Sequence, residues 1–163
     1  MAFDLVLRGG TLYDGSGAPG EPGDLAIAYN RIVAMGDGIG PAKRELDVPG
    51  LAVAPGFIDI KTHSDFTLPI NPTADSKVRQ GVTTEVIGHC GFSVAPVLPG
   101  KVDLLREYLS PSAPWLPFQE LSFPDYLSGF PATAVNAGML VGHNTLRLMV
   151  MGMDNRPPGR SRA

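Results

Sequence analysis

The chain changes character at APGFIDIKTHSDF, the stretch from Ala54 to Phe66. An apolar, β-like run ends at Asp59, and Lys61 and His63 follow at alternate positions. Alternate residues of a strand project from one face, so a D-x-H-x-H ending would aim two imidazoles at one divalent metal. Lys61 takes the first of those two positions, and a protonated lysine has no lone pair for a metal. The stretch therefore predicts a strand that ends at a metal-type site with one ligand replaced.

Composition indicates a globular protein, because 44% of the residues are hydrophobic and 18% are charged. The net charge of −3 and the absence of a basic stripe in the sequence argue against a nucleic-acid partner. No apolar run approaches the ~20 residues of a membrane span, and MAFDLVLRGG is unlike a signal peptide. The single cysteine, Cys90, cannot form an intrachain disulfide, which predicts a cytoplasmic protein with a free thiol.

The sequence predicts two domains and a tail within an α/β fold. Residues 1–53 contain short strand-like runs separated by turn signals, which predicts a small β-sandwich cap. Over residues 54–153, strand-like and helix-like segments alternate, as in the first three β/α units of a TIM-type barrel. The barrel is predicted to be incomplete, because a closed one needs roughly 250 residues. Residues 154–163 are basic and without periodicity, which predicts an irregular tail.

Ligand-capable side chains follow each of the three predicted barrel strands. His63 comes after the first strand, Cys90 after the second and His143 after the third. The carboxyl ends of barrel strands form the active site, glycines beside Cys90 allow a close backbone approach, and a thiolate binds zinc well. We therefore predict a metal or hydrolytic site that uses Cys90 and His63. His89 would point the opposite way from Cys90 along a strand, which favours a structural role.

Each candidate residue also has a structural interpretation. His63 could cap a turn, Cys90 could be an inert buried thiol, and His143 could hold its loop through a backbone hydrogen bond. Lys61 could be a surface lysine, a charge partner for an aspartate, or the mark of a lost ligand. We expect Asp65, His143 and Lys61 to support the ligands or contact substrate rather than bind metal.

Three segments together resemble the N-acyl-D-amino-acid deacylases, or D-aminoacylases, of the metal-dependent amidohydrolase superfamily. They read APGFIDIKTHSDF, QGVTTEVIGHCGFSVAP and VNAGMLVGHNTLRLMVMG, and LVLRGGTLYDGSG is similar to the small β-domain that precedes the barrel. The resemblance extends to about Pro158. It implies a zinc hydrolase that releases a carboxylate and a free D-amino acid from an N-acyl-D-amino acid.

The resemblance also implies roles for individual residues. The cysteine that holds the tightly bound zinc corresponds to Cys90, and the paired histidines of a weaker metal correspond to Lys61 and His63. Zinc polarises the amide and lowers the pKa of bound water to near 7, while a later aspartate moves the proton. That aspartate and two later histidines have no counterpart in the 163 residues. We therefore expect an amino-terminal portion of such an enzyme, truncated or frame-shifted, without a catalytic residue and inactive alone.

Two other interpretations remain open. The chain could be a non-catalytic half-barrel that pairs with itself or with a second polypeptide, because an open parallel sheet exposes apolar surface and unpaired backbone. It could also be another cyclic-amide amidohydrolase, such as a dihydroorotase or hydantoinase relative. Those enzymes share the first motif but predict no role for Cys90.

Overall fold

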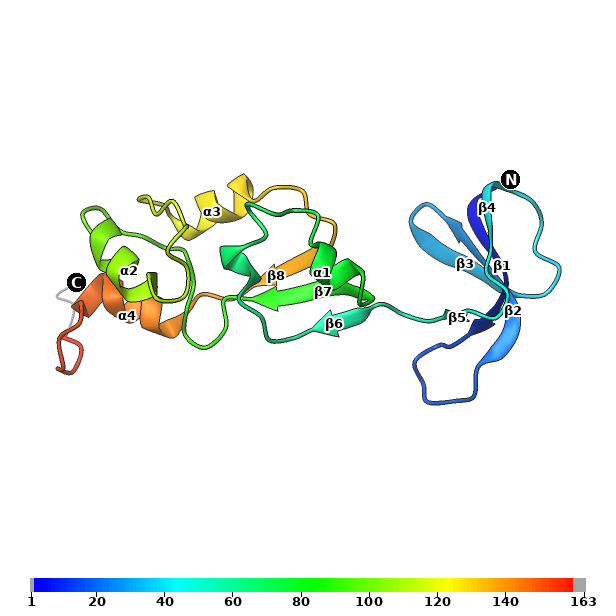
Figure 1. Ribbon diagram of the computed structural model, residues 1–163, viewed down its shortest axis with the longest axis horizontal. Coiled ribbons are helices and arrows are strands. Elements are labelled where there is room, and N and C mark those ends of the chain that lie inside the picture. Colours follow the sequence, from blue (N-terminus) through cyan, green and yellow to red (C-terminus); the bar gives the residue numbers. More distant parts are fainter. Residues whose placement is uncertain (1, 160–163) are drawn as a thin grey trace. The chain divides into compact units, whose positions relative to one another are not determined.

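The computed structural model describes residues 2–159, and the chain divides into two compact units, Met1–Pro55 and Gly56–Ala163 (Figure 1). Residues 154–159 form no helix or strand, and the last part of the predicted tail, residues 160–163, lies outside the described residues. No helix within residues 2–159 is long and apolar enough to cross a membrane.

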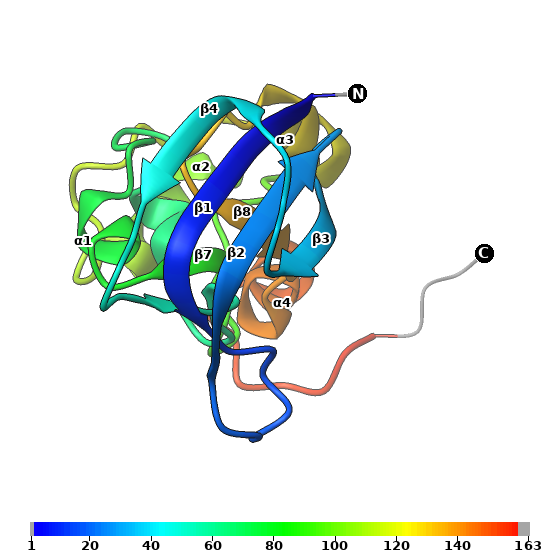
Figure 2. The ribbon, with the colours of Figure 1, turned by 90° about the vertical axis from the view of Figure 1, so that its right-hand side faces the viewer.

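The amino-terminal unit is one mixed β-sheet. Its strands are β1 (Phe3–Leu12), β2 (Glu21–Ala28), β3 (Arg31–Gly36), β4 (Ala42–Asp47) and β5 (Ala52–Val53). The order is β3-β2-β1-β4 (Figure 2). The short β5 also pairs with β1. β2 is antiparallel to β1 and β3, whereas β4 and β5 run parallel to β1.

The described strands of this unit form one mixed sheet, whereas the sequence predicted a β-sandwich of two stacked sheets. The physical reason is a shortage of inward-facing apolar residues. β4 reads AKRELD, and none of its residues is buried. A two-residue hairpin turn joins β2 to β3, with Tyr29 and Asn30 at φ values of 52° and 58°. Two consecutive left-handed residues are what a two-residue hairpin turn requires.

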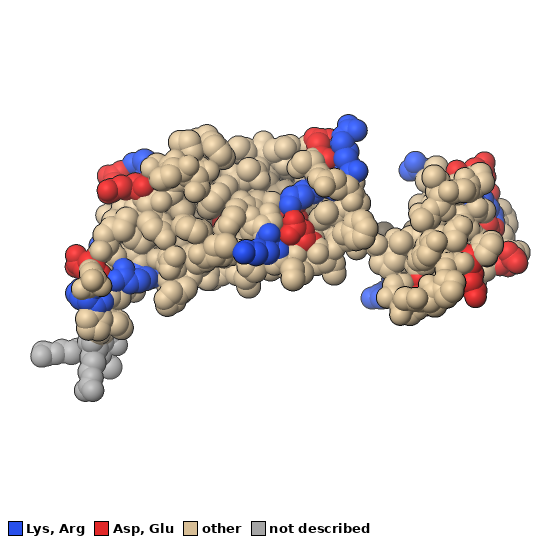
Figure 3. Space-filling model, turned by 60° about the horizontal axis from the view of Figure 1, so that its bottom comes forward, with Lys and Arg blue, Asp and Glu red and all other residues tan. Residues whose placement is uncertain are grey.

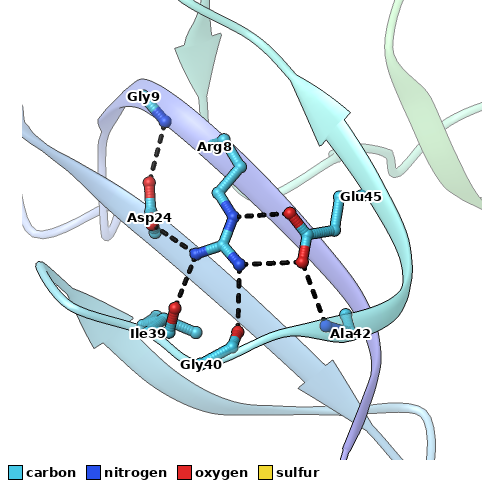
Figure 4. A network of polar contacts seen from close by, with 7 residues as sticks. All are labelled: Arg8, Gly9, Asp24, Ile39, Gly40, Ala42 and Glu45. Carbon is cyan, nitrogen blue, oxygen red and sulfur yellow. Dashed lines mark hydrogen bonds and ion pairs between the residues drawn. The ribbon is translucent and has the colours of Figure 1, made fainter.

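Arg8 ties three parts of this sheet together (Figure 4). Its Nε and Nη2 donate to the two carboxylate oxygens of Glu45 at 3.1 and 2.9 Å, and its Nη1 donates to Asp24 at 2.7 Å. The remaining donors reach the carbonyl oxygens of Ile39 and Gly40 at 2.7 and 3.0 Å. All five N–H groups of the guanidinium are thus used. The hydrogen bonds that Arg8 donates to Glu45 and Asp24 raise the pKa of Arg8 above its ordinary value.

The second unit alternates parallel strands with helices, as the sequence predicted. The elements are β6 (Phe57–Asp59), the 3₁₀ helix η1 (Ser64–Phe66), α1 (Asp75–Val78), β7 (Val82–Ile87), α2 (Val102–Leu109), α3 (Phe123–Gly129), β8 (Asn136–Met139) and α4 (His143–Met151). The strand order is β6-β7-β8, and both pairings are parallel. All three strands therefore end at the same edge, beyond which α2 and α4 lie (Figure 1).

The two faces of this sheet differ in burial. On one face, Asp59 pairs in register with Glu85, which is fully buried, and α1 packs against β7. On the other face, Ile58 is 63% exposed and the nearby Ile60 is 70% exposed. No described element covers this second face of the first strand.

A compact apolar core lies beyond the strand ends. Leu105 and Leu109 are one helical turn apart on α2, and both are fully buried against Leu148 and Met149 of α4. Phe66 of η1 joins the same cluster. This core holds α2 and α4 against the loops that leave the strands. On the face that Figure 3 presents, this unit carries scattered charges of both signs rather than one basic patch.

Candidate functional site

Three loops meet at the carboxyl edge of the parallel sheet. The N–H of Thr62, after β6, donates to the carbonyl of Val86 in β7 at 3.3 Å. The carbonyl of Gly91, after β7, accepts the N–H groups of Asn144 and Thr145 in α4 at 3.0 and 3.2 Å. These contacts bring together the three loops in which the sequence placed the candidate residues.

Cys90 lies at the tightest of these turns. It is exposed, it is not in a disulfide, and its φ of 57° is left-handed. Gly88 and Gly91 on either side have φ values of 79° and 82°. A Cβ atom on Gly142 would lie 2.3 Å from the carbonyl oxygen of Gly91, so this approach of loop and helix requires glycine. The structure thus presents the thiol at the surface, contrary to the interpretation of an inert buried cysteine.

His63 lies between two aromatic rings. Its imidazole stacks on Phe66 and meets Phe92 edge-on, each at a centroid distance of 5.8 Å. The carbonyl of His63 accepts the N–H of Phe66 at 3.1 Å, so its backbone caps the turn that begins η1. The side chain takes no part in that cap and the residue is exposed. The rings therefore hold an accessible imidazole beside the loop that follows β7.

Two further candidate residues, His143 and Lys61, are also exposed. His143 is the first residue of α4, next to Gly142 at the point where the helix meets the β7 loop. Lys61 donates its backbone N–H to Asp59 at 3.2 Å, and its side chain forms no ion pair within residues 2–159. The charge partner of Asp59 is instead Lys77.

Asp65 is buried and has no side-chain hydrogen bond. It is 2% exposed, and neither carboxylate oxygen has a partner among the described residues. Burial raises the pKa of Asp65 to about 6, and the N–H groups of Gly88 and Val94 only partly oppose that rise because neither reaches hydrogen-bond geometry. The phenol of Tyr126 donates to the backbone carbonyl of Asp65 at 3.3 Å. The side chain is therefore placed behind the site rather than in it.

A cluster that sequence reasoning missed lies under the sheet. Lys77 of α1 places its Nζ 2.6 Å from Asp59 and 3.8 Å from Glu85. The hydrogen bond from Lys77 is the main reason that the pKa of Asp59 is lowered. His89 lies near enough to lower it further, and its Nε2 is buried without a partner among the described residues. A glutamate within the β-branched run TTEVI was the only sequence signal for this cluster.

The described residues do not by themselves form a metal centre. Within residues 2–159, no group of three or more His, Cys, Asp or Glu side chains is placed to hold a metal ion. Catalytic zinc sites use three protein ligands and structural sites use four. Cys90 and His63 therefore do not fit a complete zinc site alone.

The chain is similar in sequence to known proteins. No protein-family model matches the sequence. The chain is 47% identical over 156 residues to the D-aminoacylase of Alcaligenes xylosoxydans xylosoxydans, covering 91% of this chain and 31% of that protein. It is 45% identical to the N-acyl-D-aspartate deacylase of the same organism, covering 94% and 31%.

The fold comparison agrees. The crystal structure of the Bordetella bronchiseptica N-acyl-D-glutamate deacylase, complexed with zinc and a phosphonate inhibitor, matches 93% of this chain at a TM-score of 0.76 and 37% identity. Over nearly its whole length, the chain is similar to the D-aminoacylases. It spans about a third of the length of these relatives, and it corresponds to their amino-terminal portion. The resemblance to D-aminoacylases seen in the three segments is thus confirmed. The loops of these same three segments meet at the edge of the sheet.

Proposed function

We propose that this chain provides the β-cap and the first three barrel units of a zinc-dependent N-acyl-D-amino-acid deacylase, which hydrolyses the amide bond of its substrate. The observation that carries the proposal is the meeting of three loops at one sheet edge, with Cys90 exposed at its left-handed turn. The 47% identity to a D-aminoacylase supports the reaction class. A hydantoinase-like alternative gives Cys90 no role, so the geometry of this turn favours the deacylase.

The site residues follow from position and chemistry. We assign Cys90 as a zinc ligand because its thiol is exposed on a glycine-flanked turn, and His63 as a second metal-binding residue because its imidazole is accessible. His143, Lys61 and Asp65 would support these ligands or contact substrate. No step of catalysis is assigned to the chain alone, because the described residues lack a three-ligand group.

Complementation tests this proposal. The 163-residue chain is co-expressed with a polypeptide that covers the remaining two-thirds of a D-aminoacylase, and zinc content and hydrolysis of N-acetyl-D-methionine are measured. We expect neither polypeptide alone to turn over substrate, and the pair to do so with bound zinc. Cys90→Ala should abolish both, whereas Asp103→Asn on the exposed surface of α2 should change neither. Turnover that survives Cys90→Ala would show that the thiol is not a required ligand.

A non-catalytic module that needs a partner chain is the second candidate function. The observation that favours it is the uncovered face of the sheet, where Ile58 and the nearby Ile60 are 63% and 70% exposed. Exposed apolar residues in such a group mark interaction surfaces. Light scattering after size-exclusion chromatography tests it. A dimer that dissociates on Ile58→Asp would support self-association through this face, and a clean monomer at high concentration would exclude obligate pairing.

A further inference from the structure

A pocket of about 240 Å³ lies in the second unit, between the loop after β6, the long loop after α2, and α3. Most of its walls are apolar and are formed by Pro69, Ile70, Val94, Leu116, Phe118 and Leu121. The volume is below the ~300 Å³ at which drug-sized sites begin. It therefore suits a ligand with one ring or one short branched chain.

The charges in the pocket wall have one sign. Asp65 and Asp125 both line the pocket, and no Lys, Arg or His is among the described residues that do so. Asp125 is exposed and accepts a hydrogen bond from Ser122 at 2.6 Å. Asp65 is 2% exposed and both of its carboxylate oxygens lack a partner in the described chain. The wall thus contains one buried carboxyl group that has no hydrogen-bond partner among the described residues.

A buried carboxylate affects a neighbouring pocket without direct contact. Coulomb attraction in a partly desolvated site acts over several ångströms, and salt screens it less than it screens a surface pair. An unpaired buried charge is costly, so a cation in the pocket would offset that cost, and an anion would add to it. Tyr126, which also lines the pocket, offers a phenol as a polar neighbour.

We propose that this pocket binds a small organic cation, a primary ammonium on an apolar body of about the size of a benzyl group. The apolar walls take the body, and the carboxylates of Asp65 and Asp125 attract the ammonium. This binding site goes beyond the deacylase reaction and its test needs no hydrolytic activity. The two proposals can therefore fail separately.

The test compares three probes of nearly equal shape on the full 163-residue chain. Benzylamine, benzyl alcohol and benzoate are titrated in turn at neutral pH and low salt, and amide resonances are followed by NMR. We expect benzylamine to shift the amides of Val94, Leu121 and Gly129, which line the pocket. It should bind at least about tenfold more tightly than benzyl alcohol, and benzoate should shift none of the three. Equal affinity for the amine and the alcohol, or preference for benzoate, would overturn the proposal.

Three aspartate-to-asparagine variants locate the source of the preference. Asp65→Asn should reduce the affinity for benzylamine by about fivefold, most of the way to that for benzyl alcohol. Asp125→Asn should reduce it less, because that carboxylate is exposed and screened. Asp103→Asn, on the surface of α2 and outside the pocket, should leave it unchanged. Undiminished benzylamine binding by Asp65→Asn would contradict the proposal, and the comparison of probes on the unaltered chain tests it without any variant.

Discussion

The ammonium of Lys77 lies 2.6 Å from the carboxylate of Asp59, which ends β6. The second oxygen of that carboxylate accepts the backbone N–H of Lys61 at 3.2 Å. One ion pair therefore joins α1 to the turn that leads into the candidate site. Glu85 lies 3.8 Å from the same ammonium and is fully buried, so Lys77 also provides the nearest positive charge for Glu85.

Lys77→Met should destabilise the second unit by about 1 to 2 kcal/mol, because it leaves the half-buried Asp59 and the fully buried Glu85 without this positive charge. Urea unfolding followed by circular dichroism measures the loss. Arg106→Met is the matched control, since its ion pair with Asp103 is exposed and should contribute no more than about 0.5 kcal/mol.

The same experiment identifies which carboxylate carries the cost. Adding Glu85→Gln to Lys77→Met should recover part of the lost free energy of unfolding, because the amide is neutral. Equal losses for Lys77→Met and Arg106→Met, or no recovery with Glu85→Gln, would show that the cluster is not electrostatically coupled.

Asp65→Asn should raise stability at neutral pH and have little effect at low pH. Burial raises the pKa of Asp65 in the folded chain to about 6 from an ordinary 3.8. The folded state therefore holds the proton more tightly, and this contribution to stability is full below pH 3.8 and is lost as pH rises through about 6. The gain from Asp65→Asn should grow over that window to about 3 kcal/mol.

Urea midpoints measured at a series of pH values test this, and Asp59→Asn should show the opposite sign. The pKa of Asp59 is lowered by Lys77, so its stabilising effect is present above pH 3.8 and declines as pH falls. Asp59→Asn should then be most destabilising at neutral pH. A gain from Asp65→Asn that is independent of pH would show that Asp65 has the same pKa in the folded and the unfolded chain.

Cys90→Gly should stabilise the second unit by about 1 kcal/mol. A non-glycine residue at a φ of 57° bears a steric cost that glycine avoids. Gly91→Ala should do the reverse, because its φ is 82° and an added Cβ would lie 2.8 Å from the side chain of Asn144. Thermal unfolding measures both, and destabilisation by Cys90→Gly would indicate that the thiol makes structural contacts.

Arg8→Lys should lower the melting temperature of the amino-terminal sheet although it retains the charge. A lysine cannot reproduce the paired hydrogen bonds to Glu45 or reach the carbonyl groups of Ile39 and Gly40 simultaneously. Arg44→Lys on β4 is the control, because no hydrogen bond or ion pair of its side chain is found within residues 2–159. Equal melting temperatures for the two variants would count against a role for the Arg8 network.

The local elements of the second unit could be predicted because their signals are short-range. VDLLREYL forms the amphipathic helix α2, and Pro124 lies within the first turn of α3, where proline is tolerated. The β-sandwich could not be judged in this way. Whether short strands make one sheet or two depends on how many apolar residues face inward, and β4 offers none that is buried.

In the candidate site, too, residues with a local sequence signal could be predicted, and contacts between distant parts of the chain could not. His63, Cys90 and His143 were identified from strand-end positions alone, because parallel strands end at one edge and the chain order locates those ends. The ion pair between Lys77 and Asp59 could not be predicted, since 18 positions separate the two residues. Which polar side chains are buried could not be predicted either, because burial also depends on distant segments.

The sequence alone was enough to indicate the similarity to D-aminoacylases, because three motifs at consistent spacing carry it. Only the folded chain could show that Asp65 and Glu85 are buried without hydrogen-bond partners among the described residues while Cys90 is exposed. Polarity in a sequence predicts exposure on average. The environment of one side chain depends on which distant segments pack over it, and those contacts form only when the loops and α1 close around the sheet.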